Sequence, residues 1–151
     1  MYTKILVPVD GSPTSDRAVA EAAKLAVTCS ARVQLLHVLD MTAYANGFEQ
    51  AAIYFDQIRP HALRAAEELL AKAQAKMAFS GVPIDTELRE ITGGRVANII
   101  VERALAAGAD LIVMGTHGRR GIERMLMGSD AELVARTSPV PVLLVRHPPH
   151  A

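Results

Sequence analysis

The chain has 151 residues, half of them hydrophobic, so it is long and apolar enough for a single domain with a real core. Its 16 acidic and 16 basic residues cancel, and only 4% of its residues are aromatic, which argues against a nucleic-acid-binding protein. Cys29 is the single cysteine, which excludes an intramolecular disulfide framework, and neither a signal peptide nor an apolar run of ~18 residues is visible. We therefore expect a cytoplasmic protein with neither nucleic acid nor a membrane as a partner.

Strand-like and helix-like segments alternate along the chain. The first strand, residues 4–10, is a continuous apolar run of the kind buried on both faces of a parallel sheet. Ser12 is a favourable N-cap and Pro13 a favourable first residue for the helix that follows, which should end near Cys29. Further strands are expected at residues 31–39, 83–91, 111–114 and 142–146. Further helices are expected at residues 61–79, 96–107 and 130–136.

This alternation predicts a doubly wound α/β fold, with a five-stranded parallel sheet and helices on both faces. We expect the strand order 3-2-1-4-5, one domain over residues 1–147, and a frayed tail over residues 148–151. The segment 83–91 alternates polar and apolar residues, which is typical of an edge strand. Ligands of such sheets bind beyond the carboxyl ends of the strands, where the strand order reverses. Asp10 and Gly115 would meet there if the first and fourth strands are neighbours.

Residues 114–129 form the candidate ligand-binding loop. This segment follows a buried strand, carries four glycines and leads into the last helix. Glycine lets the backbone approach an anion closely, and the N–H groups and dipole of a helix start favour negative charge. The alternative is that the glycines only permit tight turns and that Ser129 is only an N-cap. The P-loop and dinucleotide-binding motifs are both absent from the sequence.

The loop and the strand ends together resemble the universal stress protein family. Gly115-Thr-His-Gly118, a nine-residue spacer and Gly128-Ser129 match that family's ATP-binding motif, Gly-x2-Gly-x9-Gly-Ser/Thr. The segments 5–12, 109–115 and 139–145 are also similar to the family. The resemblance covers nearly the whole chain and is least diagnostic over residues 42–58.

The resemblance implies an adenine-nucleotide site for ATP, AMP or ADP. The residues implied near the adenine are Pro8, Val9, Val38 and Met114. Asp10 is implied near the ribose, and Gly115, Gly118, Gly128 and Ser129 around the phosphates. Two neighbouring side chains are further candidates for phosphate contacts, His117 and Arg119.

Asp130 departs from the family pattern, because many relatives have a small apolar residue there, often Val. Its carboxylate suits the start of a helix but would repel phosphates that it faced. Mg²⁺ or Mn²⁺ could bridge the two, since hard cations favour carboxylate and phosphate oxygens.

We therefore expect an ATP-binding universal stress protein that acts as a sensor or regulator. The resemblance also implies a homodimer through the last strand, residues 142–146, and a protein partner that the sequence does not identify. One alternative is a slow ATP hydrolase or phosphotransferase. Arg119 and a metal could neutralise charge for that chemistry, but no residue stands out to orient the nucleophile, so we assign no catalytic residue. Another alternative is an interaction protein that binds no nucleotide.

Overall fold

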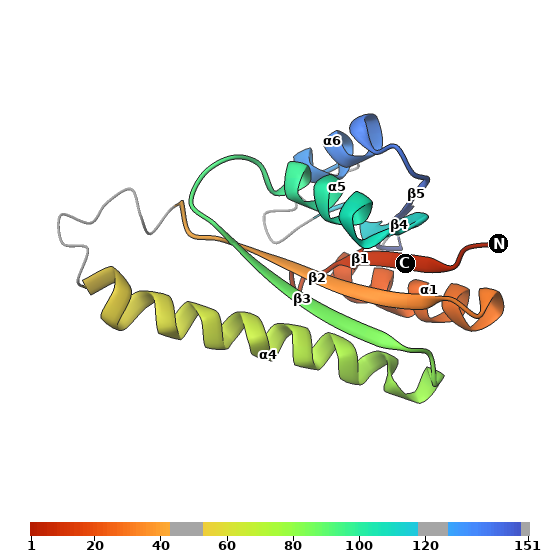
Figure 1. The fold of residues 1–151 in the computed structure, drawn as a ribbon, viewed down its shortest axis with the longest axis horizontal. Coiled ribbons are helices and arrows are strands. Elements are labelled where there is room, and N and C mark those ends of the chain that lie inside the picture. Colours follow the sequence, from red (N-terminus) through yellow and green to blue (C-terminus); the bar gives the residue numbers. More distant parts are fainter. Residues whose placement is uncertain (43–52, 118–126, 149–151) are drawn as a thin grey trace.

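Five parallel strands form one sheet in the order β3-β2-β1-β4-β5 (Figure 1). The computed structural model describes residues 1–42, 53–117 and 127–148. The strands are β1 (Lys4–Pro8), β2 (Arg32–Asp40), β3 (Ile84–Ile91), β4 (Leu111–Gly115) and β5 (Val142–Val145). The predicted fold class and strand order are therefore confirmed, and β3 lies at one edge of the sheet as expected.

Helices cover both faces of this sheet. The helices are α1 (Pro13–Cys29), α4 (Arg59–Met77), α5 (Val96–Ala107) and α6 (Ser129–Thr137), with a π-helical turn at Tyr54–Ile58 and a 3-10 turn at Ala78–Ser80. Figure 1 shows α1 and α4 on one side of the sheet and α5 and α6 on the other. Within the described ranges, no helix combines the length and apolar character that crossing a bilayer requires.

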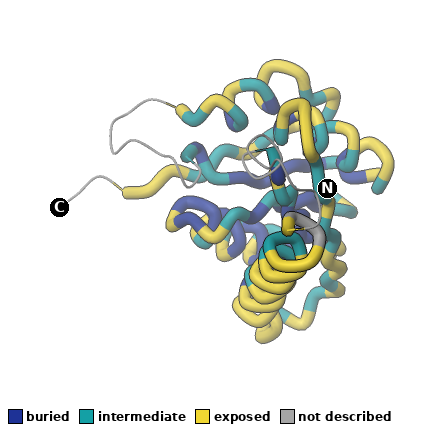
Figure 2. Tube along the Cα trace, turned by 90° about the vertical axis from the view of Figure 1, so that its left-hand side faces the viewer, coloured by how far each residue is buried: buried dark blue, intermediate teal, exposed yellow. Residues whose placement is uncertain are grey.

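The core has two layers, one on each face of the sheet, because successive strand residues point to opposite faces. Val7 and Leu35 belong to the layer under α1 and α4. Leu6 and Leu36, one residue away along the same strands, belong to the layer under α5 and α6. Figure 2 shows the buried residues along the central strands and exposed residues on the outer surfaces of the helices.

Several predicted boundaries change by a few residues. β1 ends at Pro8 rather than residue 10, because the Asp10 N–H turns away and donates to the Ser15 hydroxyl at 3.1 Å. The helix expected from residue 61 begins at Arg59, with Pro60 in its first turn, where a missing N–H costs no hydrogen bond. The tail expected at residues 148–151 falls outside the described residues from residue 149 onward.

Candidate functional site

The carboxyl ends of β1 and β4 lie side by side. The two strands pair in parallel, with Ile5 opposite Leu111 and Leu6 opposite Ile112. Asp10 follows β1, and Gly115 is the last residue of β4. The structure therefore brings these two predicted residues to the same edge of the sheet, as their places in the sequence predict.

Asp10 is held in a tight turn that starts α1. Its carboxylate accepts a hydrogen bond from the Ser12 N–H at 2.9 Å, and Gly11 between them has a φ of +80°. The Ser12 side chain then caps α1 by accepting the Ser15 N–H at 3.2 Å, which confirms the predicted N-cap. These bonds fix the Asp10 carboxylate at the sheet edge before any ligand arrives.

Position 115 requires glycine because the first turn of α1 packs directly against it. A Cβ atom at Gly115 would lie 2.5 Å from the Thr14 hydroxyl and 2.8 Å from the Thr14 carbonyl carbon. The hydroxyls of Thr14 and Ser12 both donate to the carbonyl of His117, the latter at 3.3 Å. The first turn of α1 therefore holds the segment that leaves β4. This role of Ser12 and Thr14 could not be predicted from the sequence, since only the fold brings the two segments together.

The ends of the candidate loop meet across a backbone hydrogen bond. The Gly128 N–H donates to the Thr116 carbonyl at 2.6 Å, and the Thr116 N–H donates to the Val145 carbonyl at 3.0 Å. Gly128 was expected to offer its N–H to phosphate, but in this structure that N–H is already paired. Ser129 is also not an N-cap: Gly128 occupies that position, and Ser129 is the first residue of α6.

The start of α6 is open. No side chain of the described residues caps it, and the first helical bond runs from the Glu132 N–H to the Gly128 carbonyl at 3.0 Å. The amides of residues 129–131 therefore have no acceptor within the helix, as is general for a first helical turn. Ser129 is exposed and Asp130 half-buried. Glu132 adds a second carboxylate to the first turn, beside Asp130.

Two histidines line this region in different ways. His37 in β2 is 6% exposed, and its Nδ1 lies 2.7 Å from the Val9 carbonyl, so Nδ1 carries the hydrogen. It is a packed residue of the strand. The His117 Nδ1 lies 3.0 Å from the Thr116 hydroxyl, while its Nε2 is buried without a hydrogen-bond partner among the described residues.

The four residues expected near adenine do not all share one face. Val38 and Met114 pack in the layer under α5 and α6. Val9 packs in the layer under α1 and α4, and its N–H donates to the Leu36 carbonyl at 2.8 Å. Pro8, the last residue of β1, is half-buried. The predicted residues Gly118 and Arg119 lie outside the described residues. Across residues 1–42, 53–117 and 127–148, no group of three or more His, Cys, Asp or Glu side chains is placed to hold a metal.

Comparison with known proteins identifies the family. The model of the Universal stress protein family matches residues 1–146. A universal stress protein of Methanocaldococcus jannaschii is 37% identical over 148 residues, which cover 98% of this chain and 84% of that protein. The chain belongs to the universal stress protein family.

Solved structures share the fold over almost the whole chain. The hypothetical protein MJ0577 superposes with a TM-score of 0.85 and 26% identity, covering 99% of each chain. A universal stress protein in complex with cAMP superposes with a TM-score of 0.66 and 29% identity, covering 96% of this chain and 97% of the other.

Proposed function

We propose that this protein binds an adenine nucleotide at the edge where β1 and β4 end, and that it acts as a cytoplasmic, nucleotide-dependent regulator of the stress response. The observation that carries the proposal is the open start of α6 at this edge. The hydrogen bond from the Gly128 N–H to the Thr116 carbonyl holds this helix start next to the end of β4. A relative of similar fold is known in complex with cAMP, which supports an adenine nucleotide as the ligand.

The phosphates would bind at the amides of residues 129–131. A helix start carries roughly half a positive charge, and its N–H groups are ready donors to an anion. The exposed Ser129 hydroxyl adds a further donor. At Gly115 the lack of a side chain would let the backbone approach the phosphates closely. Gly118, Arg119 and His117 are the remaining phosphate contacts that the family resemblance implies.

The base and the sugar would lie toward β1 and β2. Val38 and Met114 supply an apolar surface on the α5 and α6 face, with Pro8 beside them. The Asp10 carboxylate, already fixed by Ser12, would accept a hydrogen bond from the ribose. Val9 would then act through its backbone and its packing rather than as a direct wall of the adenine pocket.

The charge of the first turn of α6 bears on the choice of ligand. Asp130 and Glu132 are both acidic, and they would oppose a triphosphate at this helix start. ATP would therefore bind with Mg²⁺ or Mn²⁺, and AMP would depend less on the cation. Asp130→Asn should raise the affinity for ATP in the absence of a divalent cation and reduce the gain that Mg²⁺ brings.

We also propose a homodimer through β5. This strand is an edge of the sheet, and Leu143 at its middle is 37% exposed. An apolar edge strand with unpaired backbone groups is stabilised when a second copy covers it.

A pair of substitutions at one position tests the phosphate contact. Ser129→Pro removes both the N–H and the hydroxyl but suits the first position of a helix, and Gly128 before it has a ψ of 150°, which proline tolerates. Ser129→Ala removes only the hydroxyl. Losing one N–H bond to a charged phosphate costs about 1.5–3 kcal/mol, so Ser129→Pro should weaken nucleotide binding roughly 10- to 100-fold.

Calorimetric titration with ATP and AMP, with and without Mg²⁺, measures this effect, and circular dichroism checks the fold. Equal affinities of the Ser129→Pro variant and the wild type would contradict the proposed phosphate position. Mass analysis of ligand released from the purified protein adds an independent test, since we expect an adenine nucleotide to co-purify.

A further inference from the structure

A cavity of about 330 Å³ lies between α1 and α4, on the face of the sheet opposite α6. Its volume is in the range of small-molecule sites, which start near ~300 Å³. The wall combines apolar residues, among them Val9 just after β1 and Leu69 and Ala73 of α4, with four charged side chains, Asp16, Glu68, Lys72 and Lys76. Val9 and Ala73 are only 4% and 5% exposed, so this wall is continuous with the core. Leu69 is half-buried and offers apolar surface that a ligand would cover.

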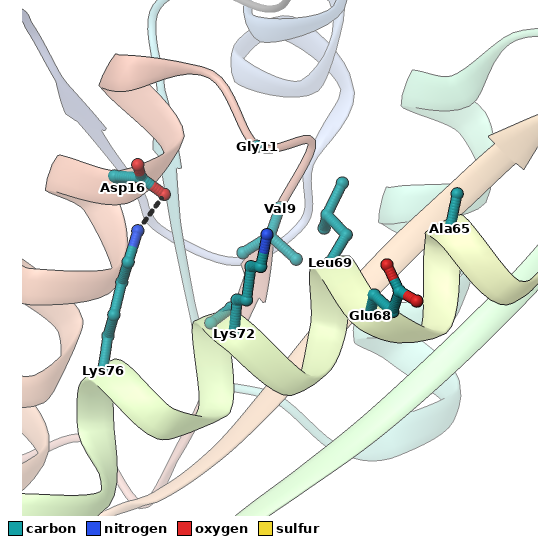
Figure 3. Close-up of a pocket in the computed structure, with 9 residues that line it drawn as sticks. Val9, Gly11, Asp16, Ala65, Glu68, Leu69, Lys72 and Lys76 are labelled. Carbon is teal, nitrogen blue, oxygen red and sulfur yellow. Dashed lines mark ion pairs between the residues drawn. The ribbon is translucent and has the colours of Figure 1, made fainter.

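The charged side chains of the cavity are not equivalent. Lys76 forms an ion pair with Asp16 of α1 at 2.8 Å, which neutralises both and ties the two helices together. Lys72, one turn earlier on α4, has no carboxylate within 4.0 Å among the described residues. Figure 3 shows its ammonium reaching toward Val9, with Glu68 one turn before it on α4.

We propose that this cavity is a second ligand site, and that it binds a small monoanion with an apolar body, such as a medium-chain carboxylate. The Lys72 ammonium meets the anionic group, and Leu69, with the small exposed parts of Val9 and Ala73, contacts the apolar chain. A lysine serves such a ligand as a point charge on a flexible stem, so it recognises the charge rather than a particular head group. The Lys76–Asp16 pair holds the far wall in place.

The cavity is distinct from the proposed nucleotide site. It lies under α1 and α4, whereas Val38, Met114 and the start of α6 belong to the other face. Val9 and Gly11 flank Asp10 and form part of the cavity wall, so the two sites are neighbours that share a stretch of backbone.

The test uses sodium octanoate as the probe and 1-octanol as its uncharged counterpart. Methyl NMR signals of Val9 and Leu69 report occupancy of the cavity. We expect both signals to shift saturably with octanoate at millimolar concentration, and octanol to bind more than tenfold more weakly because it lacks the charge. Equal affinity for the two probes, or no shift with octanoate, would overturn the proposal.

Matched variants separate charge, space and general effects. Lys72→Met should weaken octanoate binding more than tenfold, because it keeps an apolar stem and removes the charge. Ala65→Leu, on the exposed rim of the cavity, should block it, whereas Ala71→Leu, exposed on another side of α4, should leave binding unchanged. Binding that survives both Lys72→Met and Ala65→Leu would refute the site. Displacement of octanoate by AMP would also refute it, because the cavity would then belong to the nucleotide site.

Discussion

Replacing Gly115 by alanine tests how closely β4 and α1 approach each other. The added Cβ would lie 2.5 Å from the Thr14 hydroxyl and 2.8 Å from the Thr14 carbonyl carbon. Favourable carbon contacts begin near ~3.5 Å, so the first turn of α1 must move by roughly 1 Å or β4 must shift. Overpacking of this kind costs about 1–3 kcal/mol, and disturbing the Thr14 hydrogen bond to the His117 carbonyl costs about 1 kcal/mol more.

Alanine also restricts the conformations of the unfolded chain, which offsets about 0.4–1 kcal/mol of this loss of stability. The expected net loss in the free energy of unfolding is therefore about 2 kcal/mol, or a fall in Tm of roughly 4–8 °C for a domain of this size. Urea unfolding followed by circular dichroism measures it. Gly93→Ala is the matched control, since Gly93 has no heavy atom within 4 Å of its added Cβ.

A second substitution identifies the cause. Thr14→Ala removes the hydroxyl but keeps the Thr14 Cβ and main chain, which also crowd the Gly115 position at 2.8 Å. The double variant should therefore keep more than half of the Gly115→Ala loss. If Gly115→Ala were no more destabilising than Gly93→Ala, the close approach of the two segments would be wrong.

Three further predictions concern stability and assembly. Ser12→Ala should lower the free energy of unfolding by about 1 kcal/mol in urea unfolding, because α1 loses its N-cap; an unchanged midpoint would contradict that role. Burial alone would raise the pKa of Asp110, but hydrogen bonds from the Thr3 and Lys4 amides and the Thr3 hydroxyl outweigh it and hold the pKa below the ordinary 3.8. Asp110→Asn should therefore lower the free energy of unfolding by about 1 kcal/mol at neutral pH. The difference in unfolding free energy between this variant and the wild type should vanish as the pH falls below 3.8 and through the lowered pKa of the folded protein. A difference that stays constant with pH would refute the contribution of the charge. Leu143→Arg should convert the dimer to a monomer in light scattering, whereas Leu105→Arg, 57% exposed on α5, should not.

The positions of the strands could be predicted because each strand has a local sequence pattern. Continuous apolar runs mark the buried strands, and the Ser12-Pro13 start of α1 is a short-range signal that the structure confirms. The mixed pattern of β3 likewise predicted an edge strand, and it is one. These features are local in the sequence, so no knowledge of distant contacts was needed.

The details of the site could not be predicted in the same way, because they depend on contacts between distant segments. Gly115 and Thr14 are 101 positions apart, and nothing local shows that they touch. The pairing of the Gly128 N–H with Thr116 appears only once the loop is closed. The division of Val9 and Val38 between opposite faces depends on the relative register of two strands.

The most direct test of the central claim is NMR mapping of nucleotide binding on the labelled wild-type protein. We predict that AMP, and ATP with Mg²⁺, shift the backbone amide signals of residues 129–131 together with those of Asp10 and Gly115, saturably and with one affinity. Absence of binding at millimolar nucleotide, or shifts that leave the start of α6 unchanged, would contradict the proposed site.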